Sequence, residues 1–190
     1  MNKVYLAKSY LNPMNSGVHH DFLDYNKMHK TICRISPEGR PLFRTGVDTN
    51  GNYVLIQSQK PMDFNQSGRT YWENVQTSII DFGTISEGGH YSFLLTASPT
   101  KRDIKSKKIV YLGNYEEQEI WVRRKMVGST IHSLTISGHS KMCSQRGDLN
   151  KVNFSGILEI IDKKKMIENL VGGIGRSKFA GCGLLSIRAA

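Results

Sequence analysis

A glycine-rich segment near the C-terminus carries the residue types of a phosphate-binding loop. Its sequence, GGIGRSKFAGCGLL at residues 172–185, places five glycines within twelve residues and includes Arg176 and Lys178. Glycines accept positive φ and let another backbone approach closely, and the two cations attract phosphate. A dinucleotide-binding fingerprint, however, runs from strand through glycine loop to helix. Here a helical pattern precedes the loop and a strand pattern follows it, so the segment indicates a phosphate-lined groove rather than a nucleotide pocket.

A histidine at position 29 is the main candidate for proton transfer. An imidazole with an unperturbed pKa of about 6.5 exchanges protons near neutral pH. With about 100° per residue, Met28, Ile32 and Ile35 centre a buried helical stripe, and His29 falls at the edge of that stripe. Packing would hold the ring there and leave it within reach of solvent. The same place also suits a histidine with only a packing role, and the residues alone leave both interpretations open.

The elements that must hold these residues alternate between strand and helix patterns. Strand patterns cover residues 3–11, 40–47, 52–60, 90–102, 134–138, 151–161 and 184–190, and a further strand at 109–112 would open the second half. Helical patterns cover residues 19–35, with Asp21 or Asp24 as N-cap, 116–128 and 163–171. Residues 61–87 are polar around Trp72 and predict irregular chain with a short apolar piece.

The order of these elements predicts an α+β fold of two tandem ferredoxin-like (RRM-like) domains, each with an antiparallel sheet under helices. The basic cluster KRDIKSKK at residues 101–108 is typical of a solvated connection. We therefore expect an N-terminal domain at residues 1–103, which carries His29, and a C-terminal domain at residues 104–190, which carries the glycine-rich segment. Both lengths are within the usual size range of domains.

Net charge is the strongest global signal in the composition. The chain of 190 residues has 26 Lys and Arg against 16 Asp and Glu, which gives a formal net charge of +10. Such a field attracts polyanions through phosphate contacts and counterion release. Nucleic acid is therefore the first candidate partner and an anionic membrane the second, while a generically basic protein remains the plain alternative.

Several features argue against other classes of protein. The three cysteines, Cys33, Cys143 and Cys182, include no close pair, so they encode neither a disulfide framework nor a zinc knuckle. No apolar run approaches the roughly 18 residues that span a membrane, and the first residues lack the apolar segment of a secretory signal, so we expect a cytoplasmic protein. No His-Glu-x-x-His motif or carboxylate cluster offers a seat for a catalytic metal.

Four segments, taken together, resemble the CRISPR-associated repeat-processing endoribonucleases, most closely the CasE type of the type I-E Cascade system. The glycine-rich segment GIGRSKFAGCGLLSI at residues 173–187 is the most specific of them. The others are VYLAKSYLNP at residues 4–13, FLLTASPTKR at 93–102 and VNFSGILEI at 152–160. They fall in both halves of the chain and in the order that the family shows.

This resemblance implies a defined reaction. The family cleaves a CRISPR repeat RNA at the base of its hairpin without a metal or other cofactor. The RNA 2′-hydroxyl attacks the neighbouring phosphate and leaves a 2′,3′-cyclic phosphate and a 5′-hydroxyl. The resemblance further implies that the protein stays bound to the repeat RNA hairpin and joins other Cascade subunits, with no small-molecule substrate and no membrane.

The resemblance also assigns the catalytic residues. The family's histidine ends a Tyr-x-x-His pattern on the first helix, often as Met-His, and Met28-His29 matches that end. This chain departs from the pattern at the tyrosine, because Asn26 stands three residues before His29 and Tyr25 stands four before it. Positions i and i+4 also share a helix face, so Tyr25 is the second catalytic candidate, with a core or rim aromatic as its alternative role.

RNA contacts are expected from cations in both halves. In the family a basic hairpin of the second half enters the RNA groove, and SGHSKMCSQRGDLNK at residues 137–151 is the corresponding stretch. The candidate RNA-binding residues are Lys30, Lys101, Arg102, Lys141, Arg146, Arg176 and Lys178. An ordinary solvated loop is the alternative for the hairpin. For the whole chain, the rival functions are a non-catalytic RNA-hairpin-binding subunit and a basic structural protein of a ribonucleoprotein particle.

Overall fold

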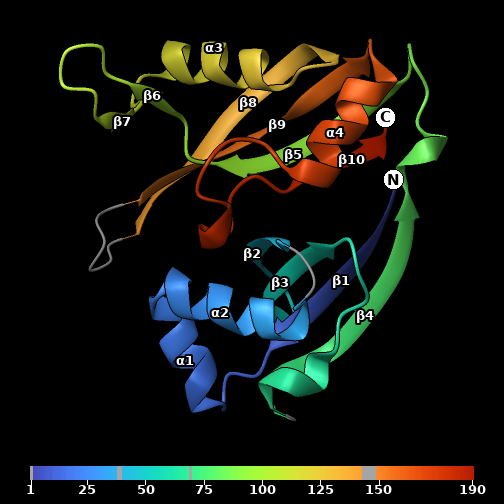
Figure 1. Cartoon of the computed structure of the whole chain (residues 1–190), viewed down its shortest axis with the longest axis vertical. Coiled ribbons are helices and arrows are strands. Elements are labelled where there is room, and N and C mark those ends of the chain that lie inside the picture. Colours follow the sequence, from blue (N-terminus) through green and yellow to red (C-terminus); the bar gives the residue numbers. More distant parts are fainter. Residues whose placement is uncertain (1, 38–39, 69, 143–148) are drawn as a thin grey trace. The chain divides into compact units, whose positions relative to one another are not determined.

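A computed structural model describes residues 2–37, 40–68, 70–142 and 149–190 (Figure 1). The chain divides into two compact units. Unit 1 comprises Met1–Gly83 and Lys178–Leu184, and unit 2 comprises Thr84–Ser177 and Leu185–Ala190. The glycine-rich segment therefore contributes residues to both units. Among the described residues, no helix is long and apolar enough to cross a membrane.

Unit 1 contains a four-stranded antiparallel sheet in the order β2-β3-β1-β4. Its strands are β1 (Lys3–Leu11), β2 (Leu42–Asp48), β3 (Gly51–Ser58) and β4 (Trp72–Asp81). Its α-helices are α1 (Ser16–Leu23) and α2 (Tyr25–Ile35), and its short 3₁₀ turns include η1 (Phe64–Ser67) and η3 (Lys178–Ala180). The order is that of a ferredoxin-like sheet, in which the connection from β3 to β4 holds η1 in place of a full α-helix.

Unit 2 repeats the same sheet with both crossover helices present. The strand order is β10-β5-β9-β8, again with antiparallel neighbours. Its strands are β5 (His90–Ala97), β8 (Ser129–Met142), β9 (Leu149–Ile160) and β10 (Leu185–Ala189), and its helices are α3 (Tyr115–Lys125) and α4 (Lys163–Gly172). A separate two-stranded sheet joins β6 (Thr100–Arg102) to β7 (Ile109–Tyr111). Two ferredoxin-like units with antiparallel sheets confirm the expected fold class.

The assignment of strands to the two halves differs from the sequence prediction. The fourth strand of the first sheet is β4, within the segment predicted to be irregular, and β5 is the first strand of the second sheet. Residues 109–111 form β7 outside the large sheets, and the basic cluster at 101–108 covers β6 and the β6–β7 turn. The units consequently divide between Gly83 and Thr84, whereas the charge pattern led us to expect a boundary at 103/104.

The exposure of β4 explains why its sequence did not reveal it. Only Trp72 of this strand is buried, and residues 73–79 are exposed on both faces. A strand that buries neither face has no alternation of apolar and polar residues, which is the signal that predicts strands. The helix expected at 19–35 is likewise two helices, because Asp24 ends α1 and caps α2 with its side chain, which accepts from the Asn26 N–H.

The core of unit 1 lies between α2 and its sheet. Met28, Ile32 and Ile35 are 3%, 0% and 0% exposed, which confirms the predicted stripe. They belong to one cluster with Phe43 of β2 and with residues of β3. Because this stripe fixes the rotation of α2 about its axis, it also fixes which side chains stand at the edge of the helix.

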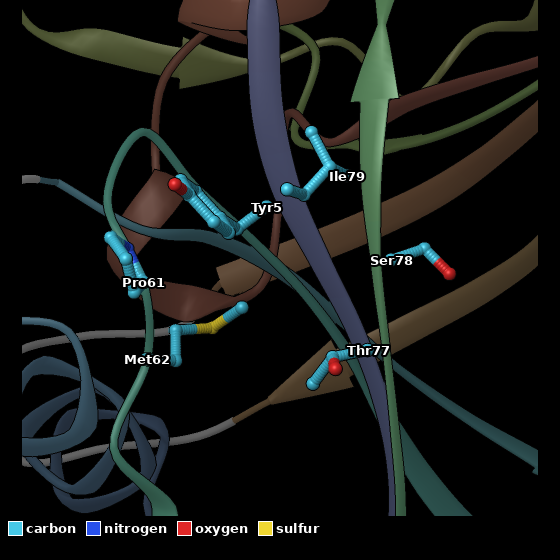
Figure 2. A pocket seen from close by; sticks show the side chains of 6 residues that line it. All are labelled: Tyr5, Pro61, Met62, Thr77, Ser78 and Ile79. Carbon is cyan, nitrogen blue, oxygen red and sulfur yellow. The ribbon is translucent and has the colours of Figure 1, made fainter.

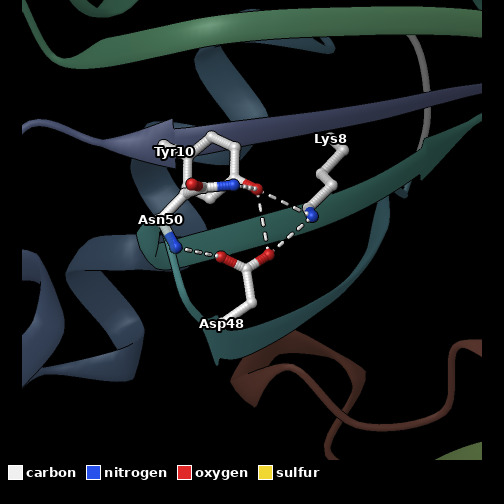
Figure 3. Close-up of polar contacts among 4 residues, drawn as sticks. All are labelled: Lys8, Tyr10, Asp48 and Asn50. Carbon is white, nitrogen blue, oxygen red and sulfur yellow. Dashed lines mark hydrogen bonds and ion pairs between the residues drawn. The ribbon is translucent and has the colours of Figure 1, made fainter.

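A polar network ties β1 to the β2–β3 hairpin (Figure 3). The Lys8 ammonium donates to Asp48 Oδ2 at 2.8 Å and to the Tyr10 hydroxyl at 3.0 Å, and the Tyr10 hydroxyl donates to the same Asp48 oxygen at 2.9 Å. The hydrogen bond between Lys8 and Asp48 is the main cause that raises the pKa of Lys8, and it is also the main cause that lowers the pKa of Asp48. Lys8 is therefore engaged in the fold of unit 1.

A pocket of about 340 Å³ opens where the β3–β4 connection lacks a helix (Figure 2). It is lined by Tyr5 of β1, by Pro61 and Met62 of the connection and by Thr77, Ser78 and Ile79 of β4. None of the candidate residues from the sequence lines this pocket. The side chain of unit 1 best suited to proton transfer near neutral pH is His29 on α2, outside this lining.

Candidate active site on helix α2

His29 is positioned by the stripe of α2 as its spacing predicts. The neighbouring Met28 is buried in the core, and His29 is half-buried at the edge of the buried stripe of α2. Burial lowers the pKa of His29 from its ordinary value of 6.5. The neutral imidazole is therefore the dominant form at neutral pH, and it has a free nitrogen lone pair with which to accept a proton.

The sulfur of Cys33 lies against the His29 ring. Its Sγ is 3.6 Å from Nε2 and 3.8 Å from Nδ1, one helical turn further along α2. Burial raises the pKa of the Cys33 thiol, so the sulfur adds no negative charge beside the ring at neutral pH. Because the two distances are nearly equal, the thiol does not select one tautomer of the histidine.

Phe179 of the glycine-rich segment lies near the rings of both catalytic candidates on α2. Its ring lies 6.3 Å from the His29 ring, centre to centre, in an edge-to-face arrangement at 71°. The same phenylalanine lies 5.4 Å from the ring of Tyr25, tilted at 55°. Such aromatic pairs have a preferred geometry and contribute beyond the burial of area. Phe179 thus contacts the rings of both catalytic candidates on α2, His29 and Tyr25.

Tyr25 shares the helix face of His29 despite its shifted spacing. The structure places it in the first turn of α2, 6% exposed, with its ring against Phe179. The i, i+4 relation therefore works as the sequence suggested, because both rings meet the same partner. Its burial is equally what a core aromatic requires, so the geometry supports the packing role at least as well as a catalytic one.

Lys178 brings a cation to the same unit. It begins η3, directly before Phe179, and it is half-buried. Burial and the neighbouring charge of Arg40 lower its pKa from the ordinary value. Two like charges in a partly desolvated place favour the arrival of an anion. Lys30, also predicted from the sequence, is exposed on α2 next to His29.

The other predicted cations lie in unit 2 or outside the described residues. Lys101 donates to Glu117 Oε1 at 2.6 Å, and Arg102 donates to the Lys107 carbonyl at 3.2 Å, so both are engaged within unit 2. Lys141 near the end of β8 and Arg176 of the glycine-rich segment are exposed. Arg146 lies outside the described residues. The structure thus places His29, Tyr25, Lys30 and Lys178 in unit 1 and does not gather all the predicted residues at one place.

Sequence reasoning missed three members of this site. Cys33, Phe179 and Arg40 were not candidates, and each is defined by its contact rather than by its type. The only advance signal for Cys33 was its i+4 spacing from His29 on a predicted helix. Phe179 and Arg40 are distant in sequence from the residues that they neighbour, and no local pattern marks such pairs.

Fold and site together define a double ferredoxin-like protein with a neutral, half-buried histidine beside a basic glycine-rich segment. Comparison with known proteins agrees with this class. The sequence profile of the family described as CRISPR associated protein matches residues 4–189, so the chain belongs to that family.

Two curated relatives are named for their activity or their assembly. The CRISPR-associated endoribonuclease Cse3 of Thermus thermophilus is 24% identical over 210 residues, which cover 97% of this chain and 99% of the relative. The CRISPR system Cascade subunit CasE of Escherichia coli is 29% identical over 157 residues, which cover 72% of this chain and 74% of the relative.

Solved structures share the fold over nearly the whole chain. Thermus thermophilus Cse3 bound to an RNA that represents a pre-cleavage complex matches with a TM-score of 0.92 at 24% identity, covering 98% of this chain and 99% of the other. Escherichia coli Cas6e matches with a TM-score of 0.74 at 24% identity, covering 98% and 100%. These likenesses extend to both ferredoxin-like units.

Proposed function

We propose that this chain is a metal-independent endoribonuclease that cleaves CRISPR precursor RNA at the base of the repeat hairpin and then stays bound as a Cascade subunit. The relatives named for endoribonuclease activity and for Cascade membership support this function. The observation that carries it is the place of His29, a neutral imidazole held at the edge of α2 against Phe179 of the glycine-rich segment.

His29 supplies proton transfer in this proposal. In the reaction the RNA 2′-oxygen forms a bond to the adjacent phosphorus while the bond from phosphorus to the 5′-oxygen breaks. The 2′-hydroxyl loses a proton and the leaving 5′-oxygen gains one, which yields a 2′,3′-cyclic phosphate and a 5′-hydroxyl. The lowered pKa of His29 favours the role of base, because the form that accepts a proton is already present at neutral pH.

The cations of unit 1 serve the phosphate. A phosphorane carries more negative charge than the phosphodiester, and a preorganised cation stabilises that added charge. Lys178, beside Arg40 and directly before Phe179, is the cation that we assign to this role. Lys30 contributes a more solvated and therefore weaker attraction. In unit 2, Lys101, Arg102, Lys141 and Arg176 are proposed contacts to the RNA backbone.

Product analysis on a hairpin repeat RNA tests this function. The purified chain is incubated with a labelled repeat RNA in EDTA, and the product ends are identified by mass. We expect one cut at the base of the hairpin, with a 2′,3′-cyclic phosphate on the upstream product and tight retention of the hairpin product. Tight binding without cleavage would instead identify a non-catalytic RNA-hairpin-binding subunit, and neither binding nor cleavage would overturn both functions.

A further inference from the structure

A cluster of metal-ligating side chains lies on the sheet of unit 2, apart in sequence from the residues assigned to cleavage. It consists of His90 of β5, His132 of β8 and Glu159 of β9. Each residue offers a ligand atom, and these atoms all lie within 4.8 Å of one another. His132 Nε2 is 3.0 Å from Glu159 Oε2, and the rings of His90 and His132 stack at 5.3 Å with a 22° tilt.

Strand pairing brings two of these residues together. β9 lies between β5 and β8 in the sheet, and His90 is the direct cross-strand partner of Glu159. The neighbours of Glu159 along its strand, Leu158 and Ile160, are fully buried, so Glu159 points to the opposite face of the sheet. Direct partners in an antiparallel pair share a face, so His90 points there as well.

A β-bulge delivers the third residue. The register of β8 with β9 shifts between Ile131 and Ser133, which leaves His132 as the extra residue. Gly156 of β9 permits the close approach of β8, because a Cβ at this position would collide with the Ser133 carbonyl oxygen. The Ser133 hydroxyl accepts from the Ile157 N–H at 3.0 Å and closes the bulge. Bulges commonly re-aim a side chain, and this one turns His132 over Glu159.

The ligand set suits a divalent transition metal. Two imidazoles and one carboxylate are the protein ligands of many zinc sites, in which a fourth position is left to solvent. The oxygen-seeking ions Mg²⁺ and Ca²⁺ bind imidazole poorly. The χ2 torsion of histidine is broad, so the two stacked rings can turn toward a shared ion at small cost.

We infer that His90, His132 and Glu159 form a binding site for a divalent transition metal of the Zn²⁺ class, which clips β5, β9 and β8 together. The site lies wholly within unit 2, while His29 lies in unit 1. It is separate from the proposed cleavage reaction and takes no part in it.

Titration of the full chain with Zn²⁺ tests the site. Metal-free protein, prepared with a chelator and then freed of it, is titrated with ZnCl₂ by calorimetry in the absence of RNA. We expect one Zn²⁺ per chain at this site, and His132→Ala weakens its binding by at least about 10-fold, the low end of what even an outer-shell partner contributes. Glu159→Gln keeps the size of the side chain and is expected to weaken binding similarly.

The control variant is His139→Ala, which removes another exposed histidine of β8 outside the cluster and leaves the Zn²⁺ affinity unchanged. Cobalt gives a second measurement, since Co²⁺ bound to nitrogen and oxygen lacks the intense charge-transfer absorption of a cobalt thiolate. Zn²⁺ affinity that survives both His132→Ala and Glu159→Gln would overturn the site, as would a thiolate band, which would place the ion on a cysteine. Because RNA is absent, neither result bears on the proposed cleavage.

Discussion

Two histidines in the two units of this chain have opposite surroundings. His29 is half-buried on a helix among a thiol and an aromatic ring, and burial lowers its pKa. His132 is exposed on a bulged strand, with a carboxylate 3.0 Å away and a second imidazole stacked on it. The first environment keeps the ring neutral and leaves a lone pair for proton transfer, while the second gathers several lone pairs for an ion. In this chain the neighbours of a histidine, rather than its residue type, decide what the ring can do.

The largest expected effect is the loss of cleavage when the RNA lacks the attacking 2′-hydroxyl, whereas loss of the metal-site histidines leaves cleavage unchanged. A repeat RNA with a single 2′-deoxynucleotide at the cleavage position lacks the attacking oxygen, so we expect no cleavage by the wild-type chain and binding within about 3-fold of normal. The double variant His90→Ala/His132→Ala is expected to cut unmodified RNA at the wild-type rate. Cleavage of the deoxy substrate would show that an external nucleophile acts, and it would contradict the proposed attack by the RNA 2′-hydroxyl.

Removal of the half-buried cation Lys178, directly before Phe179, is expected to have a smaller effect than removal of the 2′-hydroxyl. Lys178→Met keeps most of the apolar stem and loses the charge, and we expect the single-turnover rate to fall by about 10- to 100-fold, the value of a hydrogen bond to a charged group. Lys30→Met is the matched variant on α2, and its exposed charge predicts a smaller loss. Equal losses from the two variants would indicate general attraction of RNA rather than a positioned cation.

Loss of the aromatic ring of Phe179 is expected to lower the cleavage rate by a smaller factor. Phe179→Leu removes the ring that meets both His29 and Tyr25, and loss of such pairs is worth about 0.5–1.5 kcal/mol each, so we expect a rate loss of about 3- to 10-fold with little change in RNA affinity. Phe22→Leu is a suitable control, because Phe22 is 41% exposed and Phe179 is 39% exposed. An unchanged rate in Phe179→Leu would mean that the ring does not position His29.

The smallest effect is a shift in titration. In the RNA-free chain, the ring resonances of His29, identified by their absence in His29→Gln, are expected to titrate with a pKa below 6.5, because burial disfavours the charged ring. If His29 acts as the base, the cleavage rate falls as the pH drops through that pKa and levels off above it. Titration of His29 above 6.5 would contradict the proposal that burial keeps its ring neutral.

Local sequence patterns predicted many of the strands and helices of this structure. Strand patterns in the sequence predicted the segments that form β2, β3 and β9, and the stripe of Met28, Ile32 and Ile35 set the rotation that puts His29 at its edge on α2. These features are readable because each depends on burial of one face of one element.

Other features depend on partners that are distant in sequence. Exposure on both faces concealed β4, and the boundary expected at residues 103/104 followed from that omission, because β5 then took its place. The contact of Phe179 with His29 joins residues about 150 positions apart, and the bulge at His132 depends on the register of β8 against β9. No window of sequence contains both members of such pairs.

In the proposed reaction His29 transfers a proton during cleavage. The most direct test is the single-turnover rate of His29→Ala on a hairpin repeat RNA in EDTA, compared with His132→Ala, which removes a histidine from unit 2 instead. We expect a loss of about 10²- to 10⁴-fold for His29→Ala, the usual contribution of one acid-base group, and a rate within about 2-fold of wild type for His132→Ala. A His29→Ala variant that binds the RNA and cuts it at the wild-type rate would contradict the claim.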